Sequence, residues 1–234
     1  MKGVFFDLGK TLLDNYGYDQ KDAMIAIYKN TSKNIPFSEV FSKYQEAHKT
    51  IFGKAKKENS EVVLGDFLYS LLSDIGLNHN KTNNELEQIY FLEMVKYEGL
   101  IEGSKDILEW FKSNNYIIIA VSNSCISSYN LLLGMDNLGI GSYFHEIISS
   151  ADILIRKPRK EIFEYAINKM MKYNVKKDNM LFIGNDYNCD VIGSSEAGLK
   201  PVWFNQSKEK DIKDISKINV SSYKELINIL KNNE

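Results

Sequence analysis

Three side chains that could do chemistry stand at the ends of apolar runs or just before a helix in this sequence. Asp7 follows the apolar run 4–6, Ser122 follows the longer run 116–121, and Lys157 precedes a proline. A carboxylate can attack an electrophile or bind a metal ion, a hydroxyl can donate a hydrogen bond, and an ammonium can balance negative charge. Because a buried lone carboxylate is costly, we expect Asp7 to meet a positive partner.

A cluster of further oxygen-bearing side chains follows the apolar run 180–183 and its closing glycine. Asn185 and Asp186 come first, and Asp190 lies four residues beyond Asp186. From residue 104 onward, apolar strands alternate with helices, which predicts a mainly parallel, doubly wound α/β sheet. Parallel strands share their carboxyl edge, so we expect all of these groups to converge there.

The region between the first strand and residue 98 has a different pattern. Apolar residues recur there at helical spacing, and no convincing strand interrupts them. We therefore expect an all-helical cap over residues 16–98, inserted into a core domain made of residues 1–15 and 99–234. The connections at 16–18 and 98–99 are the expected hinges.

Composition excludes several classes of protein. The chain has 234 residues, 44% of them hydrophobic and 26% charged, with a formal net charge of −2. These values favour an ordinary globular protein and give no electrostatic case for a nucleic-acid or membrane partner. Two cysteines and the lack of a signal peptide or long apolar run favour a cytoplasmic location. Monomer and homodimer both remain open.

The chain resembles the haloacid dehalogenase-like hydrolases with a helical cap between their first two motifs. Asp7-Leu8-Gly9-Lys10-Thr11 is similar to the first motif, Asp-x-Asp-x-Thr. Ser122 matches the second motif and Lys157-Pro158 the third. The fourth motif is matched imperfectly by Gly184-Asn185-Asp186 with Asp190. The resemblance covers nearly the whole chain and implies a Rossmann-like core.

That resemblance implies a Mg²⁺-dependent phosphatase acting on a small phosphorylated metabolite through an aspartyl-phosphate. The implied roles are nucleophile for Asp7, with Ser122 and Lys157 as its catalytic partners. Thr11, Gly9 and Asn123 would bind the substrate. The implied metal site is drawn from the Asp7 carboxylate, the Gly9 carbonyl, Asn185 or Asp186, and Asp190 as an outer partner.

Two positions depart from the family pattern. Gly9 stands where a second aspartate normally protonates the leaving group, which removes a contribution of roughly 10²–10⁴-fold in rate. Asn185 replaces the usual first aspartate after the glycine, so the metal site loses charge. Whether Asn185 or Asp186 faces the metal stays open.

Two alternatives therefore remain beside the phosphatase. The first is a protein that keeps the fold for binding or regulation and has lost the chemistry. The second is a metal-independent 2-haloacid dehalogenase, which the pair Ser122-Asn123 resembles. Such enzymes use a cap arginine, whereas Arg156 and Arg159 both fall in the predicted core. We interpret the basic stretch around these two arginines, residues 156–160, as a solvated face.

Overall fold

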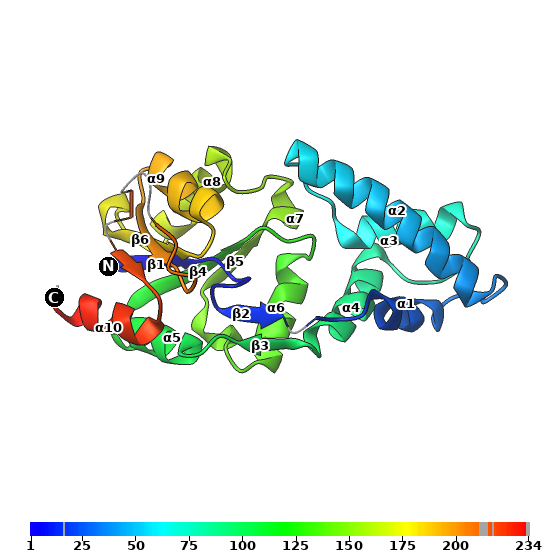
Figure 1. The fold of residues 1–234 in the computed structure, drawn as a ribbon, viewed down its shortest axis with the longest axis horizontal. Coiled ribbons are helices and arrows are strands. Elements are labelled where there is room, and N and C mark those ends of the chain that lie inside the picture. The colour runs from blue at the N-terminus through cyan, green and yellow to red at the C-terminus, as the bar shows by residue number, and fades with distance from the viewer. Residues whose placement is uncertain (16, 211–214, 217, 233–234) are drawn as a thin grey trace.

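The computed structural model describes residues 1–15, 17–210, 215–216 and 218–232. A six-stranded sheet lies at the centre of its larger part (Figure 1). The strands run in the order β5-β4-β1-β6-β7-β8, and every neighbouring pair is parallel. Their bounds are β1 Lys2–Phe6, β4 Tyr116–Ser122, β5 Glu146–Ser149, β6 Met180–Gly184, β7 Lys200–Phe204 and β8 Ile218–Val220.

Alternate residues of the central strands pack on opposite faces of the sheet. Val4 and Phe6 of β1 belong to one apolar cluster, together with side chains of the helices α5 (Ser104–Ser113) and α10 (Tyr223–Asn232). Phe5 belongs to a second cluster, together with side chains of the helix α8 (Lys160–Met171). A strand that is buried on both faces reads as an unbroken apolar run, because both of its faces need apolar side chains. This is why β1 and β4 were recognisable from the sequence.

Helices cover both faces of the sheet, so the predicted doubly wound α/β fold is confirmed. They are α5 Ser104–Ser113, α6 Ser128–Asn137, α7 Ser150–Ile153, α8 Lys160–Met171, α9 Gly193–Glu196 and α10 Tyr223–Asn232. The short elements η1 Gly141–Tyr143, η2 Lys177–Asn179 and the π-helical η3 Tyr187–Ile192 lie in the connections.

Four further helices, here called the cap helices, lie together at one end of the molecule, away from the sheet (Figure 1). They are α1 Gln20–Tyr28, α2 Phe37–Glu58, α3 Leu64–Asp74 and α4 Asn83–Val95. Their apolar faces pack on one another, with the buried Tyr44 and Tyr90 hydroxyls 2.6 Å apart. No strand lies between α1 and α4, as expected. That the cap moves as a separate domain with the predicted boundaries stays a prediction.

Two short strands connect the cap helices to the sheet, where the sequence had indicated only loops. β2 (Leu13–Asn15) pairs antiparallel with β3 (Glu98–Leu100). Three residues are too few to show a periodic pattern, which explains why they were missed. The predicted hinges adjoin this pair, although Tyr16 lies outside the described residues.

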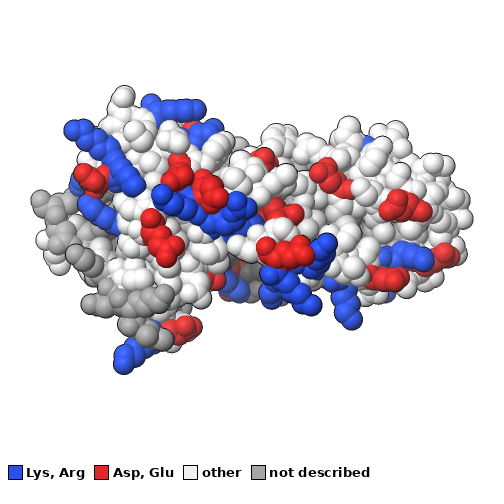
Figure 2. All heavy atoms as spheres, turned by 90° about the horizontal axis from the view of Figure 1, so that it is seen from above, with Lys and Arg blue, Asp and Glu red and all other residues white. Residues whose placement is uncertain are grey.

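The helices and the surface charge bear on the expected absence of membrane and nucleic-acid partners. Within the described part of the chain, no helix combines the length and apolar character needed to cross a membrane. In the view of Figure 2, lysine and arginine are interspersed with aspartate and glutamate over the described surface. A mixed surface of this kind matches the small net charge.

Candidate active site

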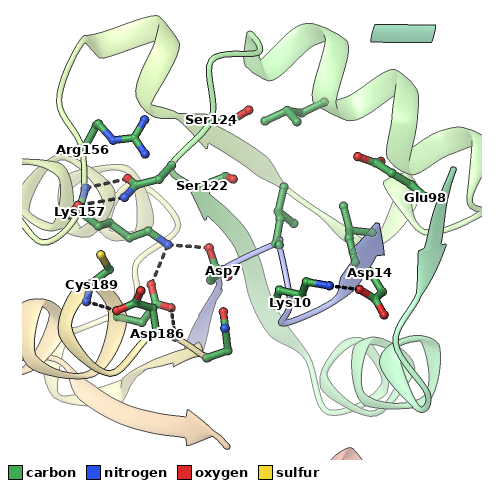
Figure 3. Close-up of a pocket in the computed structure, with 17 residues that line it drawn as sticks. Asp7, Lys10, Asp14, Glu98, Ser122, Ser124, Arg156, Lys157, Asp186 and Cys189 are labelled. Carbon is green, nitrogen blue, oxygen red and sulfur yellow. Dashed lines mark hydrogen bonds and ion pairs between the residues drawn. The ribbon is translucent and has the colours of Figure 1, made fainter. Parts of the chain in front are cut away.

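The carboxyl ends of β1, β4 and β6 meet at a cavity of about 470 Å³ (Figure 3). Asp7 directly follows β1, and its main-chain N–H donates to the carbonyl of Ile183 in β6 at 2.9 Å. Lys157 reaches the same point from the connection before α8, and its Nζ lies 2.7 Å from Asp7 Oδ1. The structure therefore joins the carboxylate and the ammonium that the sequence predicted would meet.

Lys157 is almost fully buried and holds three partners at once. Its Nζ donates to Asp190 Oδ1 at 2.7 Å and to the Val121 carbonyl at 2.9 Å, in addition to Asp7. Burial opposes the charged ammonium, but the carboxylates of Asp190 and Asp7 outweigh it and raise the pKa of Lys157 above its usual value. The two carboxylates at 2.7 Å therefore favour the charged form of Lys157.

Asp190 is fixed through both of its carboxylate oxygens. One accepts from Lys157, and the other accepts from the main-chain N–H of Asp186 at 3.0 Å. Burial raises the pKa of Asp190, the Lys157 ammonium opposes that rise, and the Asp7 carboxylate adds to it. A Cβ at position 184 would collide with this carboxylate, so glycine is required there. Asp190 lines the cavity and is placed to orient Lys157.

Asn185 and Asp186, which the sequence could not distinguish, have different environments. The Thr11 hydroxyl lies 2.8 Å from Asp7 Oδ2 and 3.2 Å from Asn185 Oδ1, which brings these two oxygens together. Asp186 Oδ1 instead accepts the main-chain N–H groups of Asn188 and Cys189 and caps η3. Asn185 is thus the better placed of the two for a ligand shared with Asp7.

Ser122 and Asn123 stand at the end of β4 and differ in what they contact. Ser122 lines the cavity, and its hydroxyl makes no hydrogen bond to any residue that the structure describes. Asn123 Nδ2 donates to the Lys157 carbonyl at 2.9 Å, and its Oδ1 accepts from the Lys157 main-chain N–H at 2.7 Å. The Asn123 side chain therefore positions Lys157. The Ser122 hydroxyl, which has no described partner, is available to a ligand in the cavity.

Gly9 lines the cavity without filling it. A Cβ built at this position meets no atom within 4 Å, so the space of the family's second aspartate is open. No described residue donates a hydrogen bond to the Gly9 carbonyl, which leaves that oxygen free for a ligand.

Glu98 of β3 and Arg156 are among the charged residues of the cavity wall that were missed as site residues in the sequence. Our interpretation of Arg156 as part of a solvated face is wrong, because its Nη1 lies 2.7 Å from Glu61 Oε2, between α2 and α3. Sequence spacing held no signal for either residue, since the packing of the cap helices on the core decides what they face.

Relatives with known names match over most of this chain. A family model of haloacid dehalogenase-like hydrolases matches residues 1–198. A glyceraldehyde 3-phosphate phosphatase of Methanothermobacter thermautotrophicus is 24% identical over 222 residues, which is 88% of this chain and 86% of the relative. The pyrimidine 5'-nucleotidase YjjG of Escherichia coli is 23% identical over 229 residues, covering 97% of this chain and 96% of its own.

Solved structures share the fold at low sequence identity. The putative HAD-hydrolase YfnB of Bacillus subtilis, bound to magnesium, gives a TM-score of 0.59 at 23% identity and covers 98% of both chains. A 2-haloacid dehalogenase of Pseudomonas syringae pv. Tomato gives a TM-score of 0.63 at 17% identity over all of both chains. This likeness establishes the fold alone. On the family match across residues 1–198, the chain belongs to the haloacid dehalogenase-like hydrolases.

Proposed function

We propose that the chain is a Mg²⁺-dependent phosphatase that hydrolyses a small phosphorylated metabolite through a phosphoryl group carried on Asp7. The observation that carries this proposal is the contact of the buried Lys157 ammonium with Asp7, beside the unpaired Ser122 hydroxyl. Named relatives that hydrolyse phosphate esters support the same reaction class.

The donor set around Asp7 fits a hard divalent cation. Asp7 Oδ2, Asn185 Oδ1 and the Gly9 carbonyl are all oxygens, which Mg²⁺ prefers. The described residues hold no cluster of three or more His, Cys, Asp or Glu side chains that could bind a metal, so an amide and a carbonyl have to complete the set. Two carboxylates, Asp7 and Asp190, share one ammonium, which leaves an excess negative charge for a cation to balance. When bound, Mg²⁺ would neutralise charge on the phosphoryl oxygens.

The chain's own residues account for the remaining steps. The Asp7 carboxylate attacks phosphorus while the bond from phosphorus to the alcohol oxygen breaks. The Ser122 hydroxyl donates to the phosphoryl oxygens, and the Lys157 ammonium, whose three N–H groups are engaged, balances the shifting charge from beside Asp7. Water then cleaves the acyl phosphate and restores Asp7. Because Gly9 offers no proton, the departing oxygen takes one from water or from the substrate.

Phosphate release from a panel of sugar phosphates, nucleotides and short acid phosphates tests this proposal. We expect turnover that a chelator abolishes, that Mg²⁺ restores, and that Asp7→Asn lacks. Asp14→Asn, an acid-to-amide change in the same cavity wall, is the matched control and should retain turnover. Complete inactivity would favour the alternative in which the protein keeps the fold for binding or regulation. Chelator-resistant halide release from 2-chloropropionate would favour the dehalogenase.

A further inference from the structure

Figure 3 shows Asp7 between Arg156 on one side of the cavity and Glu98 on the other. We call Asp7, Lys157 and Asp190 the phosphoryl end, and we call Glu98 and Arg156, which also line a second cavity, the alcohol end. This second cavity, of about 510 Å³, lies between the cap helices and the core. It shares five lining residues with the first: Glu98, Asn123, Ser124, Leu131 and Arg156. An alcohol larger than the phosphoryl group therefore has room to extend past Glu98.

Glu98 is a carboxylate without a partner. Its side chain is half-buried at the end of the β2–β3 pair, and no hydrogen bond or ion pair to a described residue reaches it. Burial raises its pKa, in line with a charge that is partly withdrawn from water. A carboxylate that is partly withdrawn from water loses hydration free energy unless hydrogen-bond donors replace it. A ligand that donates hydrogen bonds to it would recover that cost.

The remaining charges of this cavity wall decide which donor fits. Lys10 is paired with Asp14, and Arg156 is paired with Glu61. The guanidinium of Arg156 carries five N–H donors, and its contact with Glu61 uses only part of them. An ammonium group on the substrate would be repelled by Arg156 and Lys10 in the same wall, and an anionic group on the substrate would be repelled by Glu98. A hydroxyl both donates and accepts, so a polyhydroxylated alcohol can donate to the Glu98 carboxylate from one hydroxyl and present another to the Arg156 guanidinium across the cavity.

We propose that Glu98 determines substrate specificity by accepting hydrogen bonds from hydroxyl groups on the alcohol part of the ester. The substrate class is then the phosphate monoester of a neutral polyhydroxylated alcohol with at least three carbons. This inference rests on the proposed phosphatase function and adds a residue that the family's motifs do not contain.

Two esters of equal carbon number and different hydroxyl content test this proposal. sn-Glycerol 3-phosphate carries two free hydroxyls, and n-propyl phosphate carries none. We expect the wild-type chain to prefer the glycerol ester in kcat/KM by about tenfold or more, the size typical of hydrogen bonds to a charged group. Glu98→Ala should remove most of that preference by raising KM for the glycerol ester, with propyl phosphate unaffected. Glu98→Gln, which keeps one acceptor, should lose less.

The control is Glu102→Gln, because Glu102 is exposed, lies four residues further on, and lines a different cavity. It should leave the preference intact. An unchanged preference in Glu98→Ala overturns the inference, and so does an equal loss of kcat on both esters, which would indicate proton transfer instead. A wild-type preference for O-phosphoethanolamine over the glycerol ester overturns the hydroxyl assignment. A wild-type chain that hydrolyses no ester overturns the proposed function and the inference together.

Discussion

The two ends of the cavity differ in how their charges are satisfied. At the phosphoryl end the Lys157 ammonium has two carboxylates and a carbonyl around it, and both oxygens of Asp190 are occupied. At the alcohol end Glu98 has no described partner, and the charge of Arg156 is met by Glu61, which lies between two cap helices. The first end is fixed by the core whether or not a ligand is bound. At the second end, a ligand would supply hydrogen bonds to Glu98, and the position of the cap helices determines the pairing of Arg156 with Glu61.

Under the proposed function, this difference separates the residues that carry the reaction from those that select the substrate. The phosphoryl end is built from core residues at the carboxyl edge of a single sheet, so its geometry is set by the core. The alcohol end is built from β3 and from a core loop that contacts the cap helices. Changes there would alter the substrate without disturbing the ion pair at Asp7.

The largest effect is expected from breaking the phosphoryl end. Lys157→Met leaves Asp7 and Asp190 buried together with no cation between them. Breaking a buried ion pair in this way costs about 3–5 kcal/mol, so we expect the free energy of unfolding in urea to fall by that amount. The control is Lys160→Met, whose exposed pair with Glu164 should contribute little to the free energy of unfolding. Equal losses in the two variants would contradict the account of a fixed phosphoryl end.

The second largest effect concerns the open space at Gly9. Gly9→Asp places a carboxyl where a Cβ meets no other atom, and it restores the family's proton donor. We expect kcat for alkyl phosphates to rise by roughly 10²-fold, the low end of general acid catalysis. For p-nitrophenyl phosphate, whose leaving group departs without a proton, kcat should change little. A rise of the same size on both esters would show that the added carboxyl acts in some other way.

A tenfold effect is expected at the proposed metal site. Asn185→Asp adds a negative charge beside Asp7 Oδ2, where the Thr11 hydroxyl now joins the two side chains. The Mg²⁺ concentration for half-maximal turnover should fall by about tenfold, the lower range for changes around metal ligands. Asp186→Asn should leave it nearly unchanged, because Asp186 caps η3. The reverse result would assign Asp186 as the ligand.

The smallest effect is a gain of stability at the alcohol end. Because burial raises the pKa of Glu98, its ionisation disfavours folding above its unfolded pKa. Glu98→Gln should therefore raise the free energy of unfolding at pH 7 by about 1 kcal/mol, and the gain should vanish below the unfolded pKa of about 4.3. The charged groups that line the same cavity wall are Lys10, Asp14 and Arg156. A destabilised Glu98→Gln would mean that Glu98 is already satisfied.

The sequence predicted the phosphoryl end because chain order and strand ends are enough to define it. Asp7 follows an apolar strand, Ser122 ends one and Lys157 precedes a helix, and parallel strands with their crossover helices carry such residues to one edge. The choice between Asn185 and Asp186 was beyond the sequence, since the turn before η3 decides which side chain caps the helix. The fold class and family followed from the same motifs.

The alcohol end was beyond prediction for a related reason. Glu98 lies in a three-residue strand, and Arg156 has no pattern that distinguishes it from Arg159, which is exposed and pairs with Glu161. Their roles depend on how the cap helices pack on the core. β8 was missed as well, because its three residues, Ile218–Val220, are too short for a recognisable run.

Trapping the phosphoryl group on Asp7 tests the central claim most directly. The chain would be mixed with a phosphate ester and Mg²⁺, quenched in acid during turnover, and digested for mass spectrometry. We predict a phosphoryl adduct on the peptide that contains Asp7, formed in the wild type and absent from Asp7→Asn. Full turnover with no adduct, together with an active Asp7→Asn variant, would contradict the account.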